Sequence, residues 1–385
     1  MKVRICGRAG VHITAAVATA LLLAPVTTAS ATTGATGGGH RSGGAGVLFA
    51  QSDNTAANTV VAYRRAPSGA LIRRAVYATG GRGGVLNGSV VDHLASQGSL
   101  AYDRAAGLLY AVNAGSDTLT VFAVHGDRLQ RTQIIPTGGA FPVSVTFHGN
   151  RVWVLNALDG GSIQGFERRG DQLTGVDAWH RELGLDPDAT PQFTHTPGQI
   201  SFTPDGSKLV VTTKAGANSI DVFPLLRDGR PGAPVVTTVP GAVPFGFAFD
   251  PEGRLQVTEA GPNAVETFTL HRDGTLSSRG SALTGQMATC WITATNHLLY
   301  ASNAGSNTLS GYRVGRNGAL VPLGTTPTDP GTVDSAASPD GRYLYVQTGG
   351  QGIVDAFRIR PDGALTRIGS VTVPGAIGGE GIVVG

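Results

Sequence analysis

Residues 298–312, LLYASNAGSNTLSGY, repeat residues 108–122, LLYAVNAGSDTLTVF, almost letter for letter. Each copy contains an apolar run, a short turn of Asn, Gly and Ser, and a second run in which apolar and polar residues alternate. This pattern predicts a β-hairpin. Two strands cannot bury their own faces, so the hairpin must recur and pack against further copies of itself.

A second marker counts the copies. Two-residue hairpin turns occur at Ser68-Gly69, Gly126-Asp127, Gly170-Asp171, Asp228-Gly229, Asp273-Gly274, Asn317-Gly318 and Asp362-Gly363. Most of the spacings between these seven turns are 44 or 45 residues, and two are 58. A period of this length with four short strands per unit predicts an all-β fold, a seven-bladed β-propeller with four-stranded blades.

The two ends of the chain indicate how the ring closes. The unit at 287–328 contains four strand patterns, from innermost to outermost TCWITAT, LLYASN, TLSGYRV and LVPLGTT. The first unit begins directly at 47–50, VLFA, without an innermost strand, whereas the chain ends on an unassigned strand at 382–384. We expect this C-terminal strand to complete the first blade and leave no free sheet edge.

The first 31 residues predict a secretory signal peptide. Lys2, Arg4 and Arg8 form a basic start, an apolar stretch follows from 11 to 26, and Ala29-Ser30-Ala31 is a small-residue cleavage site. The apolar stretch is shorter than the roughly 20 residues that span a bilayer. We therefore expect a secreted, extracellular protein that is not inserted in a membrane after signal removal.

The rest of the chain divides into a tether and one domain. Residues 32–46 are Gly-rich and predict a flexible tether, and residues 47–385 predict a single propeller.

Removal of the leader takes away three basic residues and no acidic one, so the formal charge of +3 falls to zero. A near-neutral chain lacks the basic surface of a nucleic-acid-binding protein. Cys290 is then the single cysteine, which excludes an internal disulfide. Separately, we expect the protein to be a monomer.

Two insertions account for the long spacings. They cover residues 80–99 and 177–197 and connect one blade to the next. We expect them on the channel face of the ring, the same face as the Asn-Ala-Gly turns. Long loops on a rigid scaffold commonly carry function. We therefore expect a small-molecule ligand or a cell-surface component to bind this face.

One ring of equivalent residues contains an exception. The residues at the ends of the second strands are Ser52, Asn113, Asn156, Thr213, Glu259, Asn303 and Thr348. Glu259 is the only carboxylic acid in this ring, and we expect it at the channel mouth, with a raised pKa, as a general acid or base. The alternatives are a salt bridge with Lys214, one blade back, or a solvated loop residue. Lys214, which follows the second strand where most blades have Ala or Gly, is a candidate binding residue.

Other candidates lie at the entry to the innermost strands and in the insertions. At the strand entries, Trp291 could stack on a flat ligand or plug the channel, Asp334 could be a second carboxylate or a structural residue, and Gln199 is a further binding candidate. His93 and His195, in or beside the insertions, are candidate proton carriers or surface histidines. No spacing of His or carboxylates indicates a metal, and no motif indicates a cofactor.

With its units aligned, the chain resembles the lactonase-type seven-bladed propellers, the family of 6-phosphogluconolactonases and fungal carboxymuconate-lactonising enzymes. The resemblance covers 47–385 and rests on YAVNAGSDTL, YASNAGSNTL, SPDGRYLYV at 338–346 and FRIRPDGALTRIG at 357–369. It implies opening or closing of a lactone by His, Arg and Glu at the channel mouth. Glu259, in QVTEA, matches the acid.

The other family positions are not matched. The family's Pro-His-x-His, Pro-Arg-His and Asn-Arg-Gly segments correspond here to residues around Thr196 and Gly198, to Pro244-Phe245-Gly246 and to Asn303-Ala304-Gly305. The displaced His195 is the nearest histidine. The cations that would hold a carboxylate or phosphate are absent, unless Lys214, Arg82 or Arg181 replaces them, so phosphogluconolactone is not the expected substrate.

Two hypotheses follow from these observations. The first is a lactonase-like enzyme acting on a neutral or weakly charged lactone or related cyclic ligand, with Glu259 and His195 as catalytic residues and Trp291 packing on the ring. The second is a non-catalytic propeller that binds a glycan, a small molecule or a protein through the same face. The sequence leaves the choice between them open.

Overall fold

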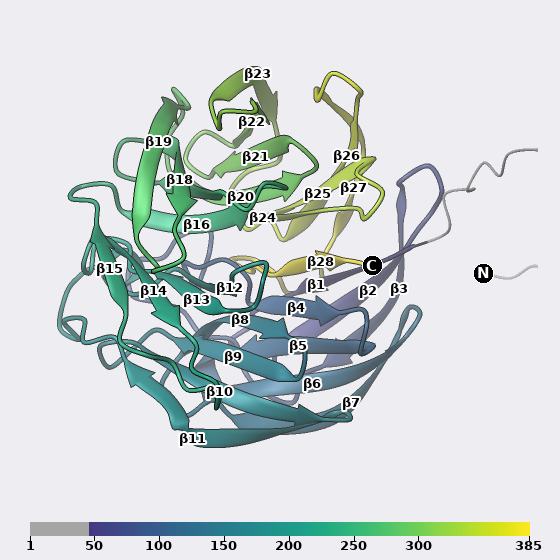
Figure 1. Ribbon diagram of the computed structural model, residues 1–385. Helices are drawn as coiled ribbons and strands as arrows, with labels where there is room; N and C mark the ends of the chain where they lie inside the picture. The colour runs from purple at the N-terminus through teal and green to yellow at the C-terminus, as the bar shows by residue number, and fades with distance from the viewer. Residues whose placement is uncertain (1–45) are drawn as a thin grey trace, which may run out of the picture. The chain divides into compact units, whose positions relative to one another are not determined.

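The computed structural model describes residues 46–385, and these form seven four-stranded antiparallel sheets arranged as the blades of a propeller (Figure 1). The predicted signal peptide and, apart from Gly46, the predicted tether lie outside the described residues. Among the residues that are described, no helix is long and apolar enough to cross a membrane.

The blades follow one another along the chain. From the innermost strand outward, the first blade contains β28 (Ile382–Val384), β1 (Gly46–Gln51), β2 (Thr59–Arg65) and β3 (Leu71–Ala78). The next three blades contain β4 (Leu100–Asp103), β5 (Leu108–Asn113), β6 (Thr118–His125) and β7 (Arg128–Pro136); β8 (Pro142–His148), β9 (Arg151–Asn156), β10 (Ser162–Arg169) and β11 (Gln172–Glu182); and β12 (Gln199–Phe202), β13 (Lys208–Thr212), β14 (Ser219–Pro224) and β15 (Val235–Thr238). The last three contain β16 (Pro244–Phe249), β17 (Leu255–Glu259), β18 (Ala264–Leu270) and β19 (Leu276–Leu283); β20 (Thr289–Thr295), β21 (Leu298–Asn303), β22 (Thr308–Val314) and β23 (Leu320–Pro327); and β24 (Thr332–Ala337), β25 (Tyr343–Thr348), β26 (Ile353–Ile359) and β27 (Leu365–Thr372).

The predicted closure of the ring is confirmed. β28 pairs antiparallel with β1, with Ala50 opposite Ile382 and Leu48 opposite Val384. The backbone N–H of Gln51 also donates to the carbonyl of Gly381 at 2.8 Å. The C-terminal strand is therefore the innermost strand of the first blade, and both ends of the propeller lie in one sheet (Figure 1).

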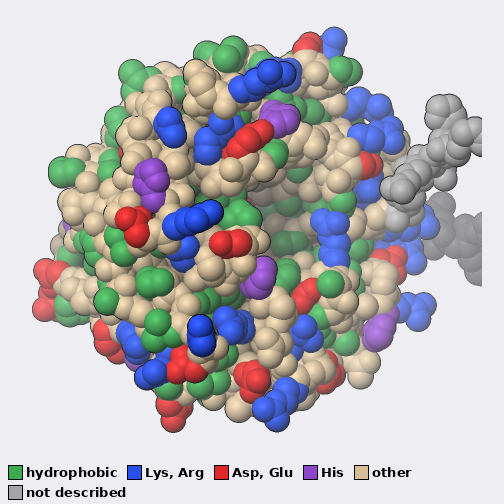
Figure 2. Space-filling view, in the orientation of Figure 1, with side chains coloured by type: hydrophobic (Ala, Val, Ile, Leu, Met, Phe, Trp, Pro, Cys, Tyr) green, Lys and Arg blue, Asp and Glu red, His purple; other side chains and the backbone are tan. Residues whose placement is uncertain are grey.

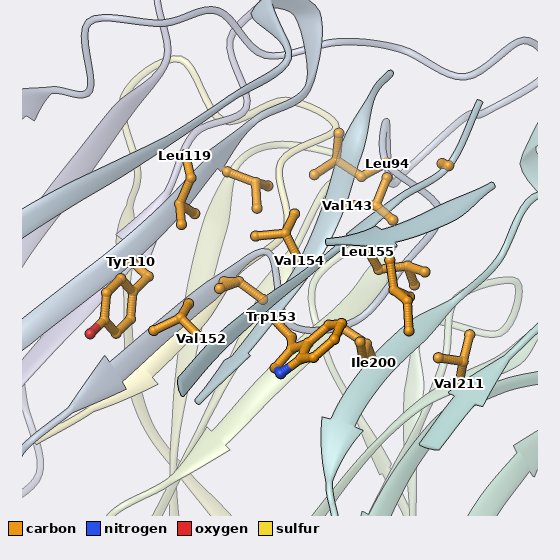
Figure 3. Packing of buried hydrophobic residues seen from close by; sticks show 14 of the residues in the cluster. Leu94, Tyr110, Leu119, Val143, Val152, Trp153, Val154, Leu155, Ile200 and Val211 are labelled. Carbon is orange, nitrogen blue, oxygen red and sulfur yellow. The ribbon is translucent and has the colours of Figure 1, made fainter. Parts of the chain in front are cut away.

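Apolar packing between blades holds the ring together. Every residue of β21 is buried, whereas the outermost strand of the same blade, β23, is mostly exposed or half-buried. Figure 3 shows the packing around β9, whose Trp153 and Leu155 meet Ile200 of the following blade. Leu94 of the first insertion belongs to the same cluster and is fully buried. The first insertion is thus anchored in the core rather than free above it.

The first insertion has the predicted bounds, but the second begins later than predicted. Residues 177–182 belong to β11, and the connecting segment runs from 183 to 198 with one short helix, α1 (Gln192–His195). The cause is Trp179, whose ring stacks on that of Trp153 with centroids 5.9 Å apart and planes 9° apart. This contact gives the longer β11 an apolar partner that an alternating pattern alone does not reveal.

Candidate functional site

A pocket of about 560 Å³ opens on the channel side of blades four, five and six. Its base contains Lys214, Phe245, Cys290 and Trp291, and residues of both connecting segments complete its wall. The complete lining is Ser89, Val90, Val91, Asp92, Ala95, Phe193, Thr194, Lys214, Val243, Phe245, Ala260, Gly261, Asn263, Met287, Ala288, Cys290, Trp291, Ala304 and Gly305. We call this cavity the channel pocket. Figure 2 shows one face of the ring, with a hollow near its centre in which hydrophobic side chains are visible.

The position after the second strand faces the channel pocket. Lys214, Ala260 and Ala304 occupy this position in three successive blades, and all three line the pocket. Glu259, one place before Ala260, does not line this pocket.

Lys214 ties the two insertions to the ring. Its side chain is 1% exposed, and its ammonium donates to the carbonyls of Ala95 and Phe193, both at 2.7 Å, and to the hydroxyl of Thr196 at 3.1 Å. Ala95 belongs to the first insertion, and Phe193 and Thr196 to the second. Lys214 therefore cross-links the two insertions and holds the pocket wall in place, and its predicted role in binding stays a prediction.

Asp92 supplies the carboxyl group of the channel pocket. Its oxygens accept hydrogen bonds from the backbone N–H groups of Leu94, at 2.9 Å, and Ser96, at 3.0 Å. Burial raises its pKa to about 7, although these amides and the charge of Lys214 act in the opposite direction. Burial also lowers the pKa of Lys214 to about 7, against the influence of Asp92 and Cys290. An acid and a base that both titrate near neutrality therefore line one apolar cavity.

Trp291 and Phe245 form the aromatic part of the base. Their rings are 4.9 Å apart at 60°, and the indole N–H of Trp291 donates to the carbonyl of Ser96 at 2.5 Å. Trp291 is buried yet lines the pocket, so it both fills part of the channel and presents a surface to a ligand. Burial raises the pKa of Cys290 to about 12, which keeps this thiol protonated and inert.

Asp334 belongs to a cluster of buried carboxyls beside the pocket. Burial raises the pKa values of Asp53, Asp92 and Asp334 to about 7 each, and mutual repulsion adds to the effect. Glu380, just before β28, is fully buried and has its pKa raised well above the usual value by burial and by these three neighbours. Its backbone N–H donates to Asp53 at 2.8 Å, and one of its carboxyl oxygens accepts from Ser96 at 2.9 Å. The carboxyl cluster joins the first insertion, through Asp92, to the segment just before β28, through Glu380.

These carboxyls predict that stability falls between about pH 4 and about pH 7. The folded pKa values of Asp53, Asp92 and Asp334 lie above the unperturbed value of 3.8. The folded state then binds more protons than the unfolded state in this window, so their contribution is complete below about pH 4 and is lost as the pH rises to about 7. The folded pKa of Lys214 lies below 10.5, so its contribution increases with pH above about 7.

Urea unfolding at a series of pH values measures this effect. We expect the free energy of unfolding to decrease by at least about 1.4 kcal/mol, the equivalent of one pKa unit, and to pass through a minimum near pH 7. Asp53→Asn should make the decrease shallower, because it removes one of the raised carboxyls. A free energy of unfolding that increases steadily from pH 4 to pH 7 would contradict the prediction.

Glu259 faces a different cavity from the one predicted. It lines an open pocket of about 510 Å³ together with Val239, Pro240 and Glu266, and it does not line the channel pocket. In three other blades Asn occupies this position, and its amide donates to hydroxyls, as Asn303 does to Ser310 at 3.0 Å. In blade five the corresponding pair is Glu259 and Glu266. Burial, with a further contribution from the neighbouring carboxyl of Glu266, raises the pKa of Glu259 to about 8, in the predicted direction. Lys214 is held elsewhere and forms no salt bridge with it.

The two histidines and Gln199 also lie outside the channel pocket. The ring of His195, in α1, faces Thr194 at 2.9 Å and lines a small cavity of about 10 Å³. His93 is half-buried; its backbone N–H donates to the carbonyl of Gly378, and burial lowers the pKa of its ring. The side-chain oxygen of Gln199 accepts from the backbone N–H of Phe247 at 2.7 Å and so connects two blades. Glu259 and His195 therefore line separate cavities and form no pair.

The structure adds Asp92 to the residues selected from the sequence. It lies next to His93 in the first insertion, so the sequence points to this segment but not to this residue. In a loop, no strand alternation indicates which of two neighbours points inward. Within residues 46–385, no group of three His, Cys, Asp or Glu side chains has the arrangement of a metal site.

Comparisons with known proteins agree with this architecture. Residues 256–378 match the family described as "Lactonase, 7-bladed beta-propeller". No curated protein sequence matches the chain significantly.

Solved structures match over most of the chain. A candidate 6-phosphogluconolactonase of Bacteroides uniformis is 19% identical with a TM-score of 0.73, over 89% of this chain and 99% of the other. The periplasmic gluconolactonase of Pseudomonas aeruginosa is 19% identical with a TM-score of 0.71, over 88% of this chain and 98% of the other. A candidate 6-phosphogluconolactonase of Bacteroides fragilis is 19% identical with a TM-score of 0.70, over 89% and 97%. Identities this low show a shared fold.

Taken together, these findings identify the chain as a seven-bladed β-propeller whose blades five to seven match the lactonase family of such propellers in sequence.

Proposed function

We propose that the protein hydrolyses a small lactone or related cyclic ester in the channel pocket. The observation that carries the proposal is an apolar cavity of about 560 Å³, lined by a carboxyl and an amine whose pKa values are both about 7. This volume is in the range of small-molecule sites, which combine apolar walls with a few polar groups. The lactonase-type fold supports the choice of a cyclic ester.

Asp92 has the properties of a general base for this reaction. As a carboxylate it takes a proton from a water molecule while the water oxygen bonds to the carbonyl carbon of the lactone. The ring C–O bond then breaks, and the same proton passes to the departing alkoxide to give a hydroxy acid. A carboxyl with a pKa near the working pH is suited to both transfers. Asp92 is only 4% exposed, so few bulk water molecules can form hydrogen bonds with its carboxylate.

Lys214 acts as a positioning residue in this mechanism. All three directions of its ammonium are occupied by Ala95, Phe193 and Thr196. Its positive charge favours the carboxylate form of Asp92 and favours negative charge that develops on the substrate oxygen in the same apolar cavity. Its hydrogen bonds fix the two segments that form the wall.

The second candidate function is binding without chemistry. The separation of Glu259 from His195 favours it, because the acid–histidine pair expected from the sequence is not assembled. In this case the channel face binds a small molecule, a glycan or a protein. The apolar lining of the channel pocket favours a small molecule over a glycan, whose hydroxyls require many polar partners.

A panel of neutral lactones tests the two functions. Ring opening releases an acid, so proton release at constant pH measures turnover. Catalysis that is saturable and disappears on heat denaturation supports the first function. Ligand binding by calorimetry without any turnover would replace it with the second.

We also propose that the protein is exported. The basic, apolar and small-residue segments of residues 1–31 support this proposal. Expression of the full chain with analysis of the culture medium and the cell fraction checks it. Export predicts an extracellular protein whose N-terminal sequence begins at Thr32, whereas a protein retained in the cell with Met1 intact would contradict it.

A further inference from the structure

Two large apolar side chains are exposed at the rim of the channel pocket. Val90, in the first insertion, is 81% exposed, and Met287, before β20, is 66% exposed, and both line the cavity. Large apolar groups that are exposed at a cavity commonly mark a binding surface. In contrast, Asp92 and Lys214, which also line the cavity, are almost completely buried. The pocket therefore has polar groups in its depth and apolar groups at its rim.

The polar groups of the wall have few hydrogen bonds left to offer. The ammonium of Lys214 is fully engaged, and both oxygens of Asp92 already accept backbone N–H groups. The hydroxyls of Ser89 and Thr194 donate to the carbonyls of His93 and Pro191. A ring that carries several hydroxyls would lose its hydrogen bonds to water on entering such a cavity, which is unfavourable.

We propose that the ligand of the channel pocket is an uncharged lactone with an alkyl or aryl substituent that covers Val90 and Met287. This inference rests on the proposed function and specifies its substrate class. The lactone ring occupies the buried part, near Asp92 and Trp291, and the substituent lies against the rim. Hydroxylated and phosphorylated sugar lactones are excluded by the same reasoning, because the pocket is lined by no Arg and its amine is occupied.

Three lactones with the same ring size separate these possibilities: δ-valerolactone, δ-decalactone and glucono-δ-lactone. Each buried methylene contributes about 0.8 kcal/mol, so we expect kcat/KM for the pentyl-substituted δ-decalactone to exceed that for δ-valerolactone by at least about tenfold. Equal values for these two, or the highest value for glucono-δ-lactone, would overturn the inference while leaving lactone hydrolysis in place.

Rim variants locate the substituent. Val90→Asp and Met287→Lys should each raise KM for δ-decalactone by a clearly larger factor than KM for δ-valerolactone. The matched controls are Val85→Asp, in the same insertion, and Leu283→Lys, at the end of β19; both side chains are exposed but do not line the pocket. If the control variants change the alkyl preference as much as the rim variants, the assignment of the rim is wrong.

Binding distinguishes failure of this inference from failure of the proposed function. If no lactone is hydrolysed, the proposed function fails, and calorimetry with the same three compounds still tests the ligand class. Tighter binding of δ-decalactone that is weakened by Val90→Asp supports the inference. Equal binding of all three, or no binding of any, overturns it.

Discussion

Asp92→Asn is expected to lower kcat for lactone hydrolysis by about 10²- to 10⁴-fold, the usual contribution of a general base. The substitution keeps the size of the side chain but removes the group that accepts the proton from water. Binding should change little, because the apolar wall is intact, so KM and the affinity measured by calorimetry should stay within about threefold of wild type.

Asp53→Asn provides the matched control. Asp53 is also a buried aspartate with a pKa of about 7, and it also accepts a backbone N–H, from Glu380 at 2.8 Å. It does not line the channel pocket. We expect Asp53→Asn to retain most of the activity, and a wild-type circular dichroism spectrum for both variants would show that the fold is kept. Full activity of Asp92→Asn would exclude Asp92 as the base, and equal losses in both variants would indicate a structural effect of the carboxyl cluster.

The pH profile gives an independent measure of the same residue. If Asp92 is the base and the charge of Lys214 assists it, kcat/KM should increase with pH as Asp92 ionises and decrease again as Lys214 loses its proton, which gives a maximum near pH 7. Glu259→Gln should leave this profile unchanged, because Glu259 lines the other cavity. Loss of activity in Glu259→Gln, with Asp92→Asn active, would instead favour the role that the sequence indicated for Glu259.

Deletion of residues 382–385 is expected to have the largest effect on stability. It removes the buried side chains of Ile382 and Val384 from the cluster they share with Tyr63 and Tyr345, and burial of each contributes about 1.5–3 kcal/mol. It also removes the hydrogen bonds that pair β28 with β1, at about 1 kcal/mol each. The total approaches the 5–15 kcal/mol that keeps a domain folded.

Thermal unfolding measures this loss. We expect the truncated protein to melt at least about 10 °C below the full chain, or to be recovered only as aggregates because β1 becomes an exposed sheet edge. Val383→Thr is the control, since this half-buried residue keeps the strand at full length. An unchanged melting temperature after the deletion would show that the ring does not depend on closure by β28.

Much of the fold could be predicted because the sequence repeats. Any unit that departs from the period of about 44 residues is visible by comparison with the others, which is how the missing first strand and the surplus last strand could be matched. The bounds of blade six were predicted almost to the residue. Where the repeat gives no guidance, as in 177–182, a single tryptophan contact decided the structure.

The site was predicted less well for two physical reasons. First, Glu259 breaks the polar ring and Lys214 breaks the ring of small side chains, and these are neighbouring positions of the repeat. The two side chains line different cavities, and the repeat alone does not indicate which of the two positions faces the channel. Secondly, Asp92 lies in an insertion without a counterpart in other blades, so no comparison within the chain could reveal it. Lys214, selected as an exception to its ring, and Trp291, selected at a strand entry, do line the channel pocket.

The pairing of β28 with β1 also has a consequence for the order of events during synthesis. The strands that complete the first blade come from the beginning and the very end of the propeller, so this contact spans the greatest possible distance along the chain. Contacts of this kind form slowly, because a long loop must close first. The ring therefore cannot be completed until β28 has been synthesised. We expect a nascent chain that stays open until then, which is the state that the export proposed above requires.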